Sequence, residues 1–473
     1  MERSRIDWPS FALAASILVI ASIPMFAYPT ESSAFLESLY TYISQKFGVL
    51  YLLAGVAAIG FLVWLAFSRF GNVRLGDTDD KPEFGEFSWI GMLFCAGVGA
   101  GLLVWCGVEW AFYYDAPPYG VEPRSVEAAE WASAYGLFHW GFTAWAIYCL
   151  PAVAIAYPYY SKKLDVLRFS VCCHWFLKGK EHGPIARAID LLFMVAMLGG
   201  AASSLGFSSP MIAETLAWLF NVEANDKLEV IVVLICILLF AGSVWMGLKK
   251  GIKRLSDINV ALAFGLLLFI LLAGPTVFIL KASLNSLGVI AQNLLRMNFW
   301  TDPFTESNFV ENWTIFYWAW WIAFAPYVGL FVTRISRGRT IRKMITGMLI
   351  WGSLGSSLFY MIMGNYGLFL EMAGTVDVTG IVSSQGGNTA LVAILEQLPL
   401  AGLVIGVFSI IAIIFAATTY DSASYTLASS ATLHLKAGDE PERWHRVFWA
   451  FSLGVMPVAL MLLNSNLRPF QVI

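Results

Sequence analysis

The sequence predicts an all-α integral membrane protein with eleven complete membrane spans and the start of a twelfth. The first observation behind this prediction is composition: 58% of the 473 residues are hydrophobic and 13% are charged, far from the balance of a soluble protein. The second is a series of apolar runs, each long enough to cross a bilayer as a helix. The runs begin near residues 11, 49, 88, 131, 188, 228, 257, 309, 343, 400 and 443.

The third observation is the gathering of Lys and Arg in alternate connections, which predicts the orientation. With the N-terminus in the cytoplasm, twenty-three of the 29 basic residues fall on the cytoplasmic side. We therefore expect a multi-pass protein of the cytoplasmic membrane. The first apolar run is long, is followed directly by further spans and lacks a small-x-small cleavage site, so it is not interpreted as a signal peptide.

The last ten residues, NSNLRPFQVI, are interpreted as a short outer loop and the first turn of another apolar segment. On this interpretation the chain stops just inside a twelfth span. The alternative is an eleven-span protein with a short outer tail.

Several function classes find no support in the sequence. A net charge of −3 gives no indication of a nucleic-acid partner. The glycines of the third span lack the phosphate-binding pattern GxxxxGK[ST] and follow no strand. The few histidines and acids do not converge as an enzyme site would require, so we expect neither catalytic residues nor a bound cofactor. The six cysteines are expected to be free thiols.

The third span contains CAGVGAGLLVWCGVEW, with glycine at positions 97, 99 and 101. Glycine weakens a helix by about 1 kcal/mol per position relative to alanine. Two interpretations compete. Gly97 and Gly101 could let another helix pack closely, as small residues four apart do, and this interpretation is slightly favoured. The alternative is a broken helix whose free backbone groups face a substrate or ion.

Two later segments are unusually aromatic. In HWGFTAWAIY of the fourth span, Trp140, Trp145 and Tyr148 lie along one broad helical face. In FYWAWWIAFAPYVG, the eighth span, Trp320, Trp321 and Phe324 share one wall. One such stripe is usually core packing, but two facing stripes can hold a cation that donates no hydrogen bonds, above all a quaternary ammonium.

The spans also contain ionisable and hydroxyl-bearing residues. His139 is more often a packing residue than a proton carrier, whereas acids in spans such as Glu109 and Asp421 are functional candidates by default. Thr418 and Thr419 offer adjacent hydroxyls suited to a hard cation such as sodium. The competing interpretation is that these threonines bond back to their own helix, and the two stand about equal. The basic turn RISRGRT, residues 334–340, predicts ion pairs with neighbouring loops.

Together these motifs resemble the betaine/choline/carnitine transporter (BCCT) family. The segment FYWAWWIAFAPYVGLFVTRISRGRT is close to the family signature, and the glycine run, HWGFTAWAIY, SSLG and TTYDSAS match family blocks in order. The resemblance implies a LeuT-like fold of twelve helices with a five-plus-five inverted repeat. The implied organisation is a two-helix segment 1–87, a first repeat 88–283, an outer connection 284–308, and a second repeat 309–473 lacking its last helix.

The resemblance also implies binding residues. An aromatic cage is implied at Trp140, Trp145, Tyr148, Trp320 and Trp321. Phe324 departs from the tryptophan common in betaine carriers, and the glycines 97, 99 and 101 complete the substrate site. A first sodium site is implied at Cys95, Val98, Phe415, Thr418 and Thr419. The threonines of the family's second sodium site are replaced by Met197 and Ala201, which favours one coupled sodium.

We therefore expect a sodium symporter for a zwitterionic quaternary ammonium or sulfonium compound, such as glycine betaine or dimethylsulfoniopropionate. A sodium-independent exchanger of the carnitine/butyrobetaine type and a choline carrier are alternatives within the family. A channel and an integral membrane enzyme are alternatives outside it. Choline carriers tend to have aspartate where this chain has Gly101, which favours a zwitterion. Relatives of this kind form homotrimers, and lipid is the other expected partner.

Overall fold

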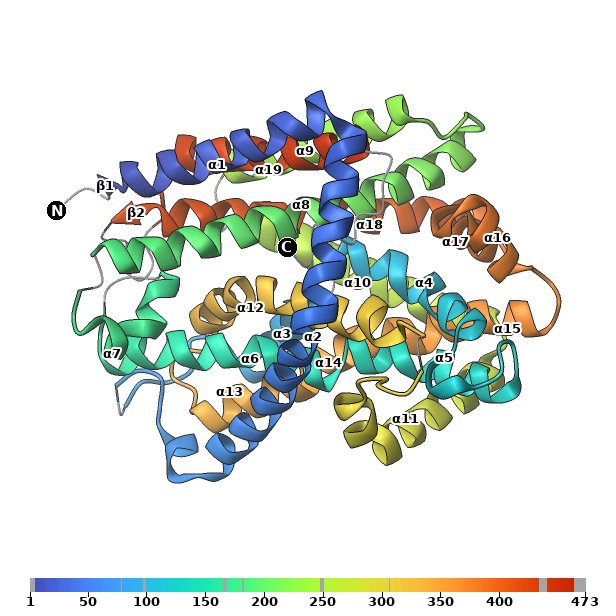
Figure 1. The fold of residues 1–473 in the computed structure, drawn as a ribbon, viewed down its shortest axis with the longest axis horizontal. Coiled ribbons are helices and arrows are strands. Elements are labelled where there is room, and N and C mark those ends of the chain that lie inside the picture. Colours follow the sequence, from blue (N-terminus) through green and yellow to red (C-terminus); the bar gives the residue numbers. More distant parts are fainter. Residues whose placement is uncertain are drawn as a thin grey trace.

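The structure is a bundle in which most long helices lie roughly along one direction and the second helix crosses them (Figure 1). The described residues include one short pair of strands, at one end of the bundle. The computed structural model describes residues 5–462 except 78, 97–98, 165–167, 181–182, 247–250, 306 and 434–439. The predicted start of a twelfth span, within residues 463–473, lies outside the described residues. The predicted all-α fold is confirmed.

Helices occupy all eleven positions at which the sequence predicts a span. In the first part of the chain these are α1 (Trp8–Ala27), α2 (Pro29–Phe67), α3 (Glu86–Ala96) with α4 (Ala100–Asp115), α5 (Val126–His139) with α6 (Phe142–Ala156), α8 (Pro184–Phe220), α9 (Asp226–Met246) and α10 (Gly251–Ala273). In the second part they are the π-helical turn η5 (Val310–Ile315) with α12 (Phe316–Ile335), the run α13 (Ile341–Gly347), η6 (Met348–Gly352), α14 (Ser353–Phe359), η7 (Tyr360–Gly364) and α15 (Asn365–Met372), then α18 (Ala401–Ser430) and α19 (Arg443–Leu462).

Shorter elements connect these helices. On the side of the N-terminus they are β1 (Arg5–Ile6), η1 (Arg69–Asn72), η3 (Tyr157–Ser161), η4 (Phe169–Cys173), α7 (His174–Leu177) and β2 (Thr432–Leu433). The remaining connections are η2 (Pro118–Gly120), α11 (Thr276–Phe299), α16 (Val378–Gln385) and α17 (Gly387–Glu396). Because α11 is one continuous helix, the expected boundary between residues 283 and 284 falls inside it.

Eight helices of the described residues are long and apolar enough to cross a membrane. Seven of them coincide with predicted spans, and the eighth is α11, which the sequence assigns to the outer connection. The other predicted spans miss this criterion for visible reasons: the third is divided into α3 and α4, and α9, α10 and α19 adjoin residues that are not described.

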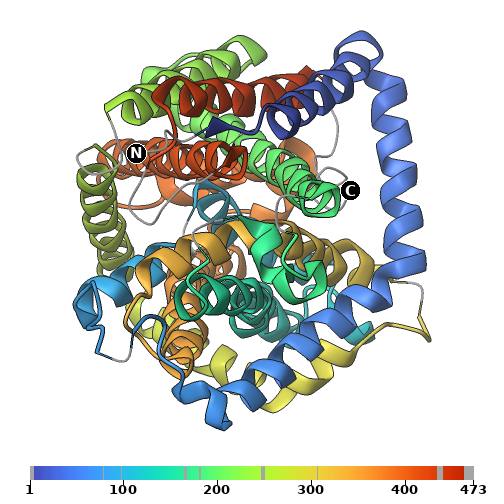
Figure 2. The same cartoon turned by 90° about the vertical axis from the view of Figure 1, so that its left-hand side faces the viewer.

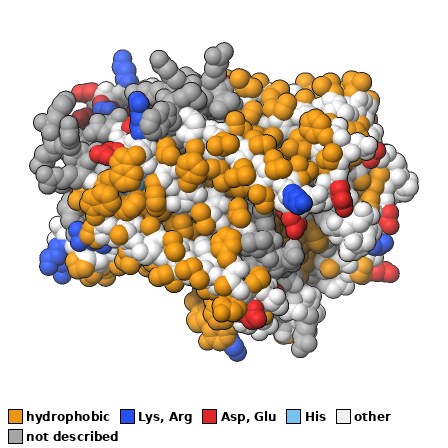
Figure 3. Space-filling model, turned by 90° about the horizontal axis from the view of Figure 1, so that it is seen from above, with side chains coloured by type: hydrophobic (Ala, Val, Ile, Leu, Met, Phe, Trp, Pro, Cys, Tyr) orange, Lys and Arg blue, Asp and Glu red, His pale blue; other side chains and the backbone are white. Residues whose placement is uncertain are grey.

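The outer face of the bundle is apolar over a broad band. Figure 3 shows hydrophobic side chains covering the middle of one face, with charged side chains mainly toward its two ends. Leu13 and Ile20 of α1 and Leu238 of α9 are among the apolar side chains that are more than half exposed. A surface of this kind suits hydrocarbon rather than water, so the chain is a multi-pass membrane protein.

The basic segments assigned to the cytoplasm come together at one end of the bundle. Strands β1 and β2 pair there, and Arg74 forms an isolated bridge with Thr340 (left-hand end of Figure 1). The predicted ion pairs of the turn 334–340 are confirmed, because Arg337 contacts Asp80 at 3.3 Å and Arg339 contacts Glu86 at 2.7 Å.

The first two helices pack against the outside of the rest of the bundle. Helix α1 packs against α8 and α19, whereas α2 continues to α6, η5 and α13, so that α2 runs along one side of the molecule in Figure 2. Helices α6 and α12 form the most extensive helix pair among the described elements. Gly329 allows this approach: a Cβ there would lie 2.9 Å from the backbone nitrogen of Ala152. This pairing turns the two aromatic segments toward each other.

Candidate functional site

The third predicted span is broken at its glycine run. Helix α3 ends at Ala96 and α4 begins at Ala100, with Gly99 in an extended conformation (φ −128°, ψ 173°). The helix is therefore broken at this point, as the broken-helix interpretation requires. That the freed backbone groups face a substrate or ion stays a prediction, and the break does not contradict close packing through the small residues, the slightly favoured interpretation. Gly97 and Val98, predicted to bind substrate and sodium, lie outside the described residues.

The break lies beside both predicted ligand sites. A Cβ at Gly101 would be 3.6 Å from Cη2 of Trp320 and 3.8 Å from Oγ of Ser204. A Cβ at Gly99 would be 3.8 Å from Oγ1 of Thr419. The N-terminus of α4, with a positive dipole and unpaired amides, is therefore placed between Trp320 of α12 and Thr419 of α18.

The five rings of the predicted cage form one connected cluster. Trp321 stacks on Trp320, with centroids 4.8 Å apart and planes at 17°, and meets Trp140 edge-on at 4.7 Å. Tyr148 meets Trp321 at 5.7 Å, and Trp145 meets Tyr148 at 5.7 Å. The structure thus brings together residues that lie up to 181 positions apart in the sequence.

Two predicted residues occupy the edges of this cluster. Trp145 packs its ring on the backbone at Gly352 of η6 and touches the cluster through Tyr148. Phe324 is directed away from the other rings: it packs against Gly200 of α8 and meets Tyr327 at 5.7 Å. A tryptophan at position 324 would therefore have to share this space with α8.

The indole N–H groups of the cage differ in their partners. Trp321 Nε1 donates to the carbonyl of His139 at 2.8 Å, and Trp140 Nε1 donates to Oε2 of Glu109 at 3.2 Å. Trp320 Nε1 is buried and has no hydrogen-bond partner among the described residues. Leaving a buried donor unpaired costs about 1–3 kcal/mol, so this N–H favours a ligand that brings an acceptor.

Behind the cage lies a polar cluster that the sequence did not predict. The Glu109 carboxylate accepts hydrogen bonds from the hydroxyls of Tyr113, Tyr317 and Tyr360 as well as from Trp140. An ionisable residue in a span is itself a signal of function, and on that ground Glu109 is a candidate. Its partners come from α4, α5, α12 and η7, however, and no spacing along the chain reveals that they meet.

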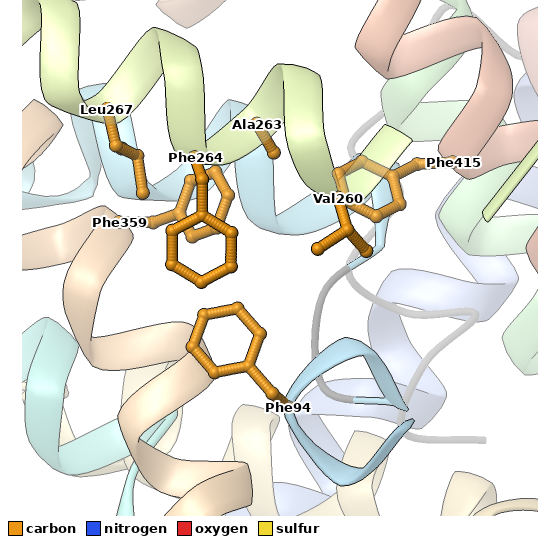
Figure 4. Close-up of a pocket in the computed structure, with 7 residues that line it drawn as sticks. All are labelled: Phe94, Val260, Ala263, Phe264, Leu267, Phe359 and Phe415. Carbon is orange, nitrogen blue, oxygen red and sulfur yellow. The ribbon is translucent and has the colours of Figure 1, made fainter. Parts of the chain in front are cut away.

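The predicted sodium residues cluster only in part. Phe415 and Phe94, which precedes Cys95, line one apolar pocket between α18, α3 and α10 (Figure 4). The Thr418 hydroxyl donates to the carbonyl of Ile414 at 2.9 Å, as the packing interpretation expected. A hydroxyl that donates its proton keeps lone pairs for a cation, so this bond is compatible with either interpretation.

The two residues that the resemblance implies at a second sodium site lie inside the bundle. Met197 and Ala201 are almost fully buried in α8, and the carbonyl of Ala201 accepts a hydrogen bond from the Tyr420 hydroxyl. A methionine and an alanine side chain offer no hydroxyl to a hard cation. A second ion would therefore have to rely on backbone oxygens here.

Comparison with known proteins gives the family. The model of the BCCT family, described as betaine/carnitine/choline family transporters, matches residues 9–473. The chain belongs to this family. An uncharacterized transporter of Escherichia coli K12, YeaV, is 35% identical over 414 residues, 88% of this chain and 86% of that protein. A carnitine transporter of Acinetobacter baumannii is 35% identical over 460 residues, 96% of this chain and 83% of that protein.

Membership makes this BCCT protein a transporter rather than an enzyme, with the LeuT-like fold of its family. Among solved structures, a sodium-coupled sialic acid symporter in a substrate-bound outward-open state overlaps with a TM-score of 0.46 and 14% identity. That overlap covers 88% of this chain and 79% of the symporter. A likeness this distant says nothing about the substrate or ion of the BCCT protein.

Proposed function

We propose that this protein takes up a zwitterionic quaternary ammonium or sulfonium compound, such as glycine betaine or dimethylsulfoniopropionate, by sodium symport. The observation that carries the proposal is the connected cage of four or more aromatic rings from α5, α6 and α12. A methylated cation donates no hydrogen bonds, so the negative faces of desolvated rings are the groups that bind it.

The preference for a zwitterion rests on the surroundings of Trp320. Its free indole N–H and the N-terminus of α4 both attract a negatively charged group. At Gly101 a choline carrier tends to have aspartate, and the described first turn of α4 contains no acid. A carboxylate carried by the substrate itself would satisfy both the N–H and the helix terminus.

Carnitine is a second candidate substrate, since one relative at 35% identity is a carnitine transporter. Carnitine is also a zwitterionic trimethylammonium compound, so the same cage and helix terminus would serve it. A sodium-independent exchange of carnitine and butyrobetaine remains the alternative mechanism, and choline the alternative substrate.

The coupling ion is proposed to be one sodium. Support comes from the break between α3 and α4, which places Gly99 beside the hydroxyl of Thr419, and from Met197 and Ala201 at the second site. The N-terminus is proposed to lie in the cytoplasm, because the positively charged segments share its end of the bundle. A homotrimer in the cytoplasmic membrane is proposed from family resemblance.

The decisive experiment is uptake into proteoliposomes. Radiolabelled glycine betaine, dimethylsulfoniopropionate, carnitine and choline would each be offered with an inward sodium gradient, with equal sodium on both sides, and without sodium. Saturable, gradient-driven uptake of a zwitterion is the expected result. Uptake that needs a preloaded substrate and ignores sodium would establish exchange instead.

A further inference from the structure

Glu109 is a fully buried acid for which the proposed transport cycle has no role so far. It lies in α4 with a relative exposure of 0%. Three hydroxyls and one indole N–H donate to it, from Tyr113, Tyr317 (2.5 Å), Tyr360 and Trp140 (3.2 Å). An ionised carboxylate is an acceptor-only group with room for about four donors, so this surrounding fits the charged form.

The hydrogen-bond chain beyond Glu109 is consistent with that charge. The Tyr113 hydroxyl donates to Glu109, and its oxygen lies 2.8 Å from Nδ1 of His139, from which it can accept a hydrogen bond. Nε2 of His139 then accepts from the Thr314 hydroxyl at 3.1 Å. This arrangement uses the neutral form of His139, so the imidazole does not cancel the carboxylate charge.

No Lys or Arg neutralises Glu109 among the described residues. The one basic side chain within 4.0 Å is His139, whose Nδ1 is 3.8 Å from Oε1 of Glu109. A buried negative charge without a cationic partner creates a strong local potential, because little solvent screens it. Glu109 contacts the aromatic cage directly through the indole N–H of Trp140.

We propose that Glu109 tunes the cage electrostatically, so that its charge sets how strongly the rings bind a cationic headgroup. An indole whose N–H donates to an anion gains electron density, which makes its face more negative and strengthens cation–π attraction. Trp140 passes this effect into the cage, where its ring lies 4.7 Å from Trp321 and 5.8 Å from Trp320. The inference rests on the proposed function and adds a specificity-determining residue to it.

Glu109 acts from behind the ring and does not compete with the substrate carboxylate. It lies two helical turns beyond Gly101 along α4, whereas the proposed carboxylate site is at the N-terminus of that helix. The two charges of a zwitterion would therefore bind to separate partners. The positive group would bind in the tuned cage, and the negative group would bind to the N-terminus of α4 and to Trp320. Glu109 thus acts on the substrate through Trp140 and does not bind the substrate itself.

The test compares glycine betaine with tert-butylacetate, in which a carbon atom replaces the quaternary nitrogen. Both would be titrated by tryptophan fluorescence into the full-length protein and its E109Q and E109D variants. E109Q should weaken glycine betaine binding by about tenfold, which corresponds to about 1.4 kcal/mol, because the neutral amide no longer attracts the cationic headgroup. Binding of tert-butylacetate should be unchanged or tighter, and E109D should keep the preference of the wild type.

Equal losses for both ligands in E109Q would mean that Glu109 only supports the structure, and would overturn the inference, as would loss of the preference in E109D. If E109Q does not fold, W140F is compared with W321F. Both replace a cage indole by a phenyl ring, but only Trp140 donates to Glu109, whereas Trp321 donates to a neutral carbonyl, so W140F should lose more of the preference for glycine betaine. Equal or smaller loss in W140F would also overturn the inference. Wild-type protein that binds no quaternary ammonium compound would instead refute the proposed function.

Discussion

At the scale of single residues, the cage tryptophans differ in their contacts. Trp321 is central: it stacks on Trp320, meets Trp140 and Tyr148, and is fixed by its bond to the carbonyl of His139. Trp145 lies behind Tyr148 against Gly352. Removing Trp321 should therefore affect binding far more directly than removing Trp145.

Trp321→Leu should abolish saturable uptake. The substitution deletes a desolvated ring face worth about 2 kcal/mol or more, which corresponds to at least a ~30-fold loss of affinity. Binding of glycine betaine to the purified variant would be measured by calorimetry. Trp64→Leu is the matched control, since Trp64 of α2 is 55% exposed on the outer face. Unchanged affinity in Trp321→Leu would exclude the cage as the binding site.

Gly101→Asp should shift the preference toward choline. The added Cβ fits, being 3.6 Å from the nearest atom of Trp320, and the carboxylate would supply the counter-charge that a net cation needs near the bilayer centre, where an unpaired charge costs about 2.5–3.5 kcal/mol. Competition of choline against labelled glycine betaine measures the shift. Gly101→Asn has the same size without the charge and should not gain choline. Choline that already competes as well as glycine betaine in the wild type would contradict the zwitterion proposal.

At the scale of elements, the break between α3 and α4 is the feature on which the proposed ion coupling depends. It sets Gly99, at the N-terminus of α4, beside Thr419 of α18. Helix α18 itself is continuous over 30 residues. One interrupted and one intact helix could therefore share an ion through backbone oxygens on one side and hydroxyls on the other.

Combined substitution of Thr418→Ala and Thr419→Ala should raise the sodium concentration for half-maximal uptake by tenfold or more. The reason is that two hydroxyl ligands, worth about 1 kcal/mol each, are lost. Uptake by the unmodified protein should depend on sodium with a Hill coefficient near one, because the second site lacks hydroxyls. Thr426→Ala, two turns further along α18, is the control. Sodium-independent uptake by the wild type would support the exchanger.

At the scale of the whole molecule, one end of the bundle is held together by a buried ion network. Arg168 contacts Asp7 at 3.3 Å and Asp190 at 3.7 Å, and donates to the carbonyl of Thr432 at 3.2 Å. Asp7 also lies 3.6 Å from Arg187. The network joins the N-terminal strand, the connection after α6, the start of α8 and the end of α18.

Arg168→Ala should destabilise the folded protein by about 3–5 kcal/mol, because it removes a cation shared by two buried carboxylates, of which only Asp7 keeps another basic neighbour, Arg187. Thermal unfolding of the detergent-solubilised protein would register this as a clear drop in Tm. Arg337→Ala, which removes a half-exposed pair with Asp80, should cost about 1 kcal/mol or less. Equal drops in Tm for the two variants would show that the buried network contributes no more to stability than the half-exposed pair.

Local chemistry in the sequence determined much of this protein. Apolar length predicts the spans, charge distribution predicts which loops share a side, and glycine density makes a break in the third span possible, because each of these depends on neighbouring residues alone. The motif FYWAWW and the block HWGFTAWAIY likewise indicated the family and five rings that the structure joins. Whether the broken or the packed interpretation of the glycine run is correct could not be settled from spacing, since both use the same residues.

Only the tertiary structure decided the long-range partners. Phe324 shares a helical wall with Trp320 in sequence, yet it faces α8 because Gly200 leaves room there. Glu109 looks remote from the substrate along α4, yet η7 and α12 bring two hydroxyls to it and the residue after α5 brings the indole of Trp140. Hydrogen bonds between residues 31 to 251 positions apart depend on how helices pack, and helix packing is a property of the whole bundle.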